Sequence, residues 1–360
     1  MNRNKIKHNY GIDLLPIVAM LMIVAHHFSL HSGIAVASGS SDDVFMRVMA
    51  LGGKTGVNIF VLITGYFSSG KIRTKKIADL IGCATFYSLA LTAVAVLTGS
   101  VAFSSKMLLK AAVPLLFGDT YWFIVTYLEL YILIPLLNMV VERLEGKPYR
   151  NYLLLFAGLL CILPTVVGKF IHVNDLGYNA LVWFVYLYFL GAYLRRCSLG
   201  GGAWQYICGA VVMMAIQIAA CTAIALGVGD GILGAVLVCI SDYGANAVFP
   251  LTIAVAMCLG FQRIRISGGK RLLQTAGAAT LGIYLFHDNA NLRGWLWENV
   301  YRLTLRIAPM PFAIHAVITV IAVFALGFAV EFLRNLTAKK LQGYIRRNKN
   351  ETSLHHCSDQ

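Results

Sequence analysis

The chain has 360 residues, of which 58% are hydrophobic and only 13% are charged, and its mean hydropathy is +0.71. These values exclude a soluble globular domain and indicate an integral membrane protein. Each membrane-spanning helix needs about 20 apolar residues, so a chain of this length with short loops holds roughly ten of them. No room is left for a separate soluble domain.

Apolar runs of bilayer length recur along the chain, separated by charged, Gly-rich or Pro-containing stretches. We predict ten transmembrane helices, at 12–32, 54–68, 78–99, 121–141, 151–171, 178–195, 203–228, 245–262, 275–292 and 311–335. The apolar stretches 107–117 and 231–240 are too short to cross and are typical of interfacial or re-entrant segments. The predicted fold class is an all-α polytopic membrane protein: residues 1–340 form one integral-membrane domain, and residues 341–360 form a polar cytoplasmic tail.

The distribution of basic residues predicts the orientation. With ten spans both termini lie on one side, and the segments on that side hold 22 of the 30 Lys and Arg. The opposite loops hold the other eight: Arg47, Lys54, Lys106, Lys110, Lys169, Arg293, Arg302 and Arg306. Because basic residues gather on the cytoplasmic side, we predict a plasma-membrane protein with both termini in the cytoplasm.

The net charge of +14 requires no nucleic acid as partner, since most basic residues flank spans where anionic lipid headgroups attract them. An alternative assigns part of this charge to the phosphates of a cytosolic donor, at 71–76 and 263–271. The eight cysteines show no CxxC spacing and lie mostly in apolar stretches, so we predict neither a disulfide framework nor a metal site.

His27 lies about 20 Å from the cytoplasmic start of the first predicted span, in the outer half of the bilayer. An ionisable ring at that depth is costly to expose to lipid, so it should face a cavity or a partner and marks a candidate functional site. His26 points about 100° away around the helix and is a candidate for supporting His27 or for packing. Other predicted spans bring polar or aromatic side chains to the same level: Asn58, Glu129, Trp183, His287 and Asp288.

One face of the first predicted span carries a further pattern. Asp13, His27 and His31 fall on one side of the helix and define a track from the cytoplasmic mouth to the outer end. Such a track suits a substrate that must cross the membrane. Pro16 is expected in the first helical turn, where its missing N–H costs little.

Five stretches, covering nearly the whole chain in order, have a familiar pattern. They are YGIDLLPIVAMLMIVAHH at 10–27, GVNIFVLITGYF at 56–67, YWFIVTYLELYILIP at 121–135, WFVYLYFLGAYLR at 183–195 and LGIYLFHD at 281–288. Together they resemble acyltransferase family three, whose members are integral-membrane enzymes typified by those that O-acetylate bacterial surface polysaccharides.

The family's first-helix signature is an arginine, ten intervening residues and a histidine treated as essential for acyl transfer. The histidine matches His27, whereas Pro16 occupies the arginine position. The two positions share a helix face about 16 Å apart, so the arginine would lie near the donor rather than touch the imidazole. Either Lys71 or Arg73 compensates, or this is a weakened or inactive variant, or the substitution is a defect.

The resemblance implies a donor, an acceptor and roles for the polar residues. It implies acetyl-CoA bound near Lys71, Arg73 and Asp13, with Arg263 or Arg265 as further candidates, and a hydroxyl of a cell-envelope, capsular or exopolysaccharide glycan as acceptor. His27 would act as general base or as a covalent acyl relay. Glu129 or Asp13 would orient it; the oxyanion donors would be Asn58, Tyr284 or His287. The remaining candidates either stack on the sugar or form an interfacial belt: Tyr121, Trp122 and Trp183.

Two other functional classes compete with this interpretation. A secondary transporter or a flippase of lipid-linked sugars would use His27 and Glu129 as a proton relay. A non-catalytic membrane partner of polysaccharide-synthesis machinery would tolerate the replacement of His27. Membrane lipids are partners in every case.

Overall fold

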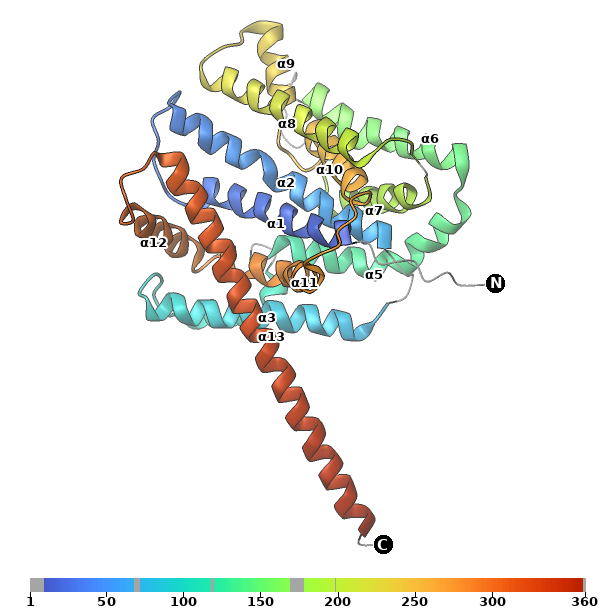
Figure 1. Cartoon of the computed structure of the whole chain (residues 1–360), viewed down its shortest axis with the longest axis vertical. Coiled ribbons are helices and arrows are strands. Elements are labelled where there is room, and N and C mark those ends of the chain that lie inside the picture. Colours follow the sequence, from blue (N-terminus) through green and yellow to red (C-terminus); the bar gives the residue numbers. More distant parts are fainter. Residues whose placement is uncertain (1–9, 68–71, 118–119, 169–177, 198, 359–360) are drawn as a thin grey trace.

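The computed structural model describes residues 10–67, 72–117, 120–168, 178–197 and 199–358. Within these residues every regular element is a helix, so the predicted all-α class is confirmed (Figure 1). The helices are α1 Tyr10–His31, α2 Ser41–Phe67, α3 Thr74–Leu97, α4 Ser105–Ala112, α5 Trp122–Arg143, α6 Gly146–Ala157, α7 Ala180–Arg196, α8 Ala203–Ala225, α9 Gly231–Ser241, α10 Val248–Phe261, α11 Lys270–His287, α12 Arg293–Leu305 and α13 Phe312–Ser358. A 3₁₀ turn at Pro114–Leu116 follows α4, and π-helical turns at Gly158–Ile162 and Pro164–Gly168 continue α6.

Seven helices of the described chain are long and apolar enough to cross a membrane: α1, α2, α3, α5, α6 with its continuation to Gly168, α8, and α13 up to Lys340. They coincide with seven of the ten predicted spans, and the chain is a multi-pass membrane protein. The other three predicted spans correspond to α7, α10 and α11. Helices α7 and α10 have only 17 and 14 residues, and α11 begins with Lys270 and Arg271. The count of ten and the sidedness remain predictions.

The start of α2 differs from the prediction. This helix begins at Ser41 instead of residue 54. Asp42 and Asp43 lie in its first turn, where carboxylates interact favourably with the helix dipole, and Asp43 accepts a hydrogen bond from the backbone N–H of Gly39 at 3.0 Å. Lys54 is therefore in the middle of a helix, and its assignment to a loop is wrong.

Helix α1 lies at the centre of the bundle, against α2, α11 and α13 (Figure 1). Glycines make the close approach to α2 possible. A Cβ added at Gly56 would lie 2.6 Å from the carbonyl oxygen of Ala19, and one added at Gly53 would overlap the ring of His26. Small residues at such a helix contact allow backbones to pack tightly within a membrane.

Two helices extend beyond the predicted bounds. Helix α1 begins by Tyr10, so Pro16 lies inside the helix, where it removes a backbone hydrogen bond, and not in the first turn. Residues 341–358, predicted only as a polar tail, continue α13, which has 47 residues and a length of about 70 Å. No proline interrupts this segment, and Leu, Gln, Lys and Arg favour helix. Figure 1 shows α13 extending well beyond the bundle.

Candidate functional site

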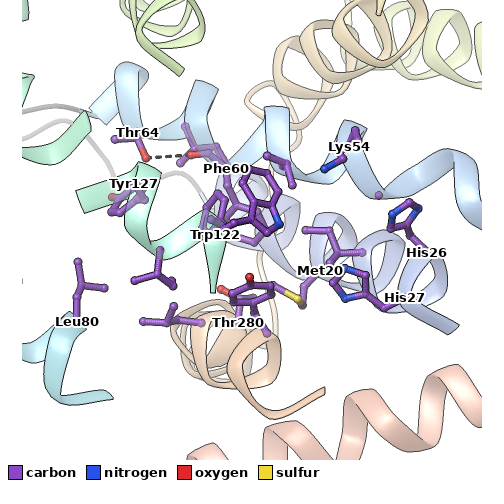
Figure 2. Close-up of a pocket in the computed structure, with 18 of the residues that line it drawn as sticks. Met20, His26, His27, Lys54, Phe60, Thr64, Leu80, Trp122, Tyr127 and Thr280 are labelled. Atoms are coloured by element: carbon purple, nitrogen blue, oxygen red, sulfur yellow. Dashed lines mark hydrogen bonds between the residues drawn. The ribbon is translucent and has the colours of Figure 1, made fainter. Parts of the chain in front are cut away.

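A cavity of about 240 Å³ opens between α1, α2, α3, α5 and α11 (Figure 2). His26 and His27 line one end of it, and Lys76 and Leu80 of α3 line the other. The walls are mainly apolar and aromatic, with the hydroxyl residues Thr64, Tyr127 and Thr280 among them. An apolar cavity with a few polar groups is typical of a small-molecule site.

His27 forms a hydrogen-bonded chain with His287 and a backbone carbonyl. Nδ1 of His27 lies 2.9 Å from Nε2 of His287, whose Nδ1 lies 2.6 Å from the carbonyl oxygen of Ile283. A carbonyl can only accept, so His287 carries its proton on Nδ1 and, when neutral, accepts at Nε2. A neutral His27 must then donate from Nδ1. Its Nε2 keeps a lone pair that can accept a proton.

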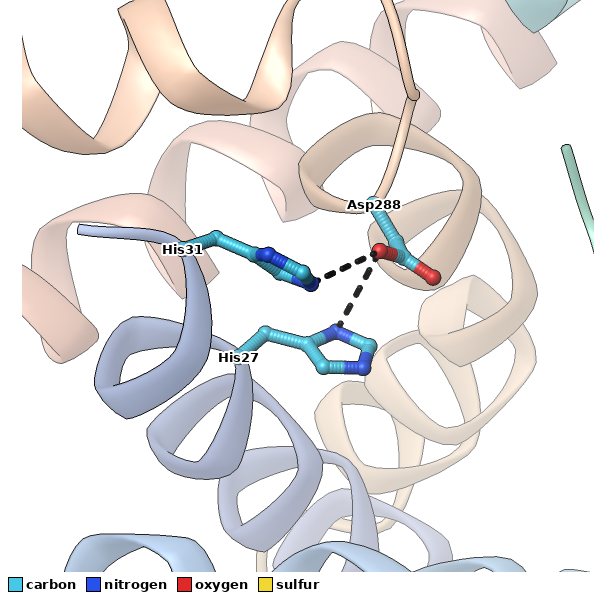
Figure 3. Close-up of side chains that lie close together, drawn as sticks. All are labelled: His27, His31 and Asp288. Atoms are coloured by element: carbon cyan, nitrogen blue, oxygen red, sulfur yellow. Dashed lines mark ion pairs between the residues drawn. The ribbon is translucent and has the colours of Figure 1, made fainter. Parts of the chain in front are cut away.

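Asp288 joins several charged or basic groups near His27 (Figure 3). Its Oδ1 lies 3.9 Å from Nδ1 of His27, 3.8 Å from Nε2 of His31 and 3.1 Å from Nη1 of Arg293. Only 7% of the Asp288 side chain is exposed, against 33% for Arg293. A carboxylate in this position can stabilise a positive charge on His27.

Asp288 and the two histidines near it form the group in the described chain whose geometry could hold a metal ion. One ligand atom each from His27, His31 and Asp288 lies within 4.8 Å of the others. However, Nδ1 of His27 is bonded to His287, and the Asp288 oxygen accepts from the Arg293 guanidinium, whose charge repels a cation. The arrangement is better described as an ion-pair cluster around Asp288.

Lys54 lines the cavity beside the two histidines, although the sequence assigned it to a loop. Its ammonium lies 4.3 Å from the centre of the Trp122 ring, a cation–π contact. Figure 2 shows Lys54 and Trp122 around the same space as His26 and His27. Trp122 thus contacts a lysine inside the bundle, which a role in an outer aromatic belt does not explain.

His26 also faces the cavity, which a packing role alone does not explain. Its Nδ1 lies 2.6 Å from the carbonyl oxygen of Ala50, so this nitrogen carries the proton and Nε2 is an acceptor. The ring fits against α2 because Gly53 has no side chain. Tyr284 of α11 lines the cavity too, and its side chain is buried.

A second cavity of about 550 Å³, here called the vestibule, adjoins the first. The two share Lys76, Leu80 and Leu281, and the vestibule also has Arg334 and Lys339 of α13 in its wall. Nζ of Lys76 lies 3.3 Å from the Tyr127 hydroxyl and 4.6 Å from the centre of the Tyr131 ring. Lys76 is therefore positioned where the vestibule meets the cavity.

Three of the predicted substrate-binding residues lie outside the cavity. Asn58 is fully buried, accepts a hydrogen bond from Nε1 of Trp183 at 2.9 Å and donates one to the carbonyl of Ala245 at 2.8 Å. The hydroxyl of Tyr121 donates to the carbonyl of Leu285 and accepts from Asn289. These bonds satisfy the three side chains within the helix bundle. The prediction that they bind substrate gains no support.

The structure does not bring Glu129 or Arg73 to His27. Glu129 is exposed on α5 and lines neither cavity, so the prediction that it orients His27 does not fit the geometry; Asp288 occupies that position. Arg73 is exposed at the start of α3, where its backbone N–H donates to the Tyr131 hydroxyl. Asp13 lies in the first turn of α1, outside the cavity lining. Lys71 lies outside the described residues.

The sequence interpretation missed Lys54, Lys339 and the partnership of His27 with His287. The acidic residues Asp42 and Asp43 favour a helix start near residue 41. A second span extended to that start would have placed Lys54 in the middle of the helix. No local sequence pattern predicts the contact between His27 and His287, because the contact depends on how α1 and α11 are rotated against each other.

The fold and the cavity define a polytopic membrane protein with a histidine-centred site between its helices. A family profile described as an acyltransferase domain matches residues 9–332, which is most of the chain. The chain belongs to acyltransferase family 3, as the sequence motifs indicated, and it is a membrane acyltransferase. No curated protein and no solved structure matches it in the same comparisons.

Proposed function

We propose that this protein transfers an acetyl group from acetyl-CoA to a hydroxyl of a cell-envelope, capsular or exopolysaccharide glycan, with His27 as general base. The observation that carries the proposal is the path from the vestibule to His27. The vestibule and the cavity adjoin at Lys76, and the unprotonated Nε2 of His27 is at the far end.

The vestibule suits the charged part of acyl-CoA. Lys76 and Lys339 can bind phosphate, whereas the Arg334 guanidinium is engaged by Glu331 at 2.7 Å. The N-terminus of α3 adds to this, because its dipole attracts an anion and Arg73 at its N-cap provides no side-chain cap. Arg73 thus remains our candidate for donor binding, with Lys76 as the better positioned cation.

The cavity suits the pantetheine arm and the thioester. The arm is a narrow chain with two amides, and the hydroxyls of Thr64 and Thr280 each donate to a backbone carbonyl, so each can still accept from an amide N–H. The apolar walls exclude water from the thioester and limit its hydrolysis. An acyl group threaded along this path ends beside His27 and His26.

The chemistry follows from the proton positions. Nε2 of His27 takes the proton of the acceptor hydroxyl while that oxygen attacks the thioester carbon. The imidazolium that forms is stabilised by Asp288, whose Oδ1 lies 3.9 Å from Nδ1, and by Nε2 of His287. His27 then returns the proton to the departing thiolate. The acceptor approaches from the end of α1, where His31 and Arg293 are partly exposed.

The transporter alternative has less support. It needs a proton relay between His27 and Glu129, and Glu129 is exposed and outside the cavity. Membership of an acyltransferase family argues in the same direction. We therefore propose the acyltransferase function alone.

Proton NMR of surface polysaccharide tests the proposal. A strain lacking the gene is complemented with the unaltered chain, with His27→Ala or with an empty vector. We expect O-acetyl signals with the unaltered chain alone, at equal amounts of membrane protein. Equal acetylation with His27→Ala would refute the role of His27. Absence of acetylation with either chain would refute the acceptor, and purified protein that releases no CoA from acetyl-CoA would refute the donor.

A further inference from the structure

Lys54 presents a cation at membrane depth that the proposed function does not yet use. A lysine in the middle of a spanning helix is costly, so it faces the bundle interior or a cavity and marks a candidate functional site. Lys54 is the fourteenth residue of α2 and lines the cavity together with His26 and His27.

The ring of Trp122 contacts this ammonium inside the cavity. The ring centre lies 4.3 Å from Nζ, and the negative face of an indole attracts a cation. Among the described residues that line the cavity, the other cation is Lys76, which lies at the vestibule end. Of these two cations in the cavity wall, Lys54 is therefore the one at the His27 end.

We propose that Lys54 is a catalytic residue, the electrophile that stabilises the oxyanion of acyl transfer; this inference rests on the proposed function. When the acceptor oxygen bonds to the thioester carbon, the electron pair of the C=O bond moves onto the carbonyl oxygen. The Lys54 ammonium lies at this end of the cavity and keeps all its protons. The pair then returns, the C–S bond breaks, and the thiolate takes the proton that His27 held.

The surroundings make such a charge effective. In an apolar, water-poor cavity a fixed cation acts on a developing anion far more strongly than it would in water. The buried hydroxyl of Tyr284 lines the same cavity and can donate to the same oxygen. The sequence named Tyr284 for this role; Lys54 supplies the charge that a hydroxyl lacks.

Steady-state kinetics of the full chain in liposomes tests the assignment. The probes are acetyl-CoA and alkali-deacetylated surface polysaccharide, and the readouts are CoA release and ester formation. We expect Lys54→Met to lower kcat by about 10²- to 10³-fold, as for the loss of one oxyanion donor, with little change in the KM for acetyl-CoA. Lys54→Arg should retain more activity than Lys54→Met. The matched control is Lys106→Met, an exposed lysine on α4, which should leave kcat unchanged.

Chemical rescue separates catalysis from folding. Methylammonium should raise the kcat of Lys54→Ala by about tenfold or more and leave Lys106→Ala unaffected, because the small amine can occupy the space of the lost side chain. Trp122→Leu should lower kcat by about three- to thirtyfold, in line with the loss of a cation–π contact.

Two results would overturn the assignment in distinguishable ways. If Lys54→Met turns over within about twofold of the unaltered chain while His27→Gln is inactive, Lys54 is not the electrophile and the acyltransferase function stands. If the unaltered chain itself neither releases CoA nor forms ester, the proposed function fails and the assignment fails with it.

Discussion

A backbone carbonyl determines which nitrogen of His27 can accept a proton. The Ile283 carbonyl can bond only a protonated Nδ1 of His287, and this leaves His287 Nε2 to accept from His27. In the proposed reaction the base is therefore Nε2, and no carboxylate of the described residues forms a hydrogen bond with the ring. In that reaction His287 would position His27 and would take no proton from the substrate.

Replacing His287 tests this arrangement at the scale of one residue. We expect His287→Phe to lower kcat by about 10- to 100-fold, as when a group that orients a catalytic histidine is removed, with the KM for acetyl-CoA almost unchanged. His287→Gln, which can both donate and accept, should recover part of the loss. Stopped assays of CoA release measure both. A His287→Phe variant with full kcat would show that His27 needs no partner.

The sequence identified His27 because an imidazole at mid-span is costly to expose to lipid. It could not identify the partner. Helix α1 is apolar almost all round, so no hydrophobic face indicates how it is rotated against α11. For the same reason Asn58 and Trp183 could not be separated from the cavity residues: their depth is right, but their side chains bond to each other.

At the scale of helices, Pro16 changes both the backbone and the charge of α1. As a proline inside the helix it removes the hydrogen bond to the carbonyl of Ile12 and can cost about 3 kcal/mol. It also shares a helix face with Met20 and His27, which line the cavity. The family arginine would therefore point along the donor path.

Two substitutions separate these effects. Pro16→Ala restores the backbone bond alone and should raise the melting temperature in detergent. Pro16→Arg should do the same and also lower the KM for acetyl-CoA several-fold, because a guanidinium binds phosphate in two-point contact. Thermal unfolding and steady-state kinetics measure the two quantities. If both variants have the same KM as the unaltered chain, the arginine position has no part in donor binding here.

Helix α13 is joined to α3 and α11 by a buried carboxylate. Glu331, only 3% exposed, accepts hydrogen bonds from Tyr87 at 2.8 Å, from Arg334 at 2.7 Å and from Asn335 at 2.9 Å. A Cβ at Gly282 of α11 would overlap this carboxylate, so the glycine leaves the space it needs. The network forms part of the vestibule wall.

Removing one partner of this network should lower the stability of the protein more than replacing both partners by apolar residues. We expect Glu331→Gln to destabilise the protein by about 3 kcal/mol, because it leaves the guanidinium of Arg334 without a charged partner in a partly buried place. The double variant Glu331→Leu with Arg334→Met should recover much of that loss. Thermal unfolding in one detergent compares the three proteins. Equal destabilisation by the single and double variants would mean that apolar packing, and not the ion pair, joins these helices.

For the whole molecule, the proposed reaction requires that the vestibule and the His27 end open to opposite sides of the membrane. The excess of basic residues predicts which side is the cytoplasm, and it agrees with a donor that enters past Lys76. The sequence could predict this orientation because the charge asymmetry is a sum over the loops and does not depend on how the helices pack. Helices α7 and α10 have only 17 and 14 residues and α11 begins with Lys270 and Arg271, so the membrane crossing of these three helices stays a prediction.

Cysteine labelling in intact cells decides the orientation. Lys106 of α4 and Lys147 of α6 are both exposed and lie in segments predicted to face outside and inside, so they form a matched pair. In a background from which the eight native cysteines have been removed, an impermeant maleimide should label Lys106→Cys in intact cells and Lys147→Cys only after permeabilisation. The reverse pattern would place the vestibule outside, away from cytosolic acetyl-CoA, and the donor path would have to be abandoned even if His27 proved essential. Labelling of both positions in intact cells would show that the bundle is not inserted as a spanning unit.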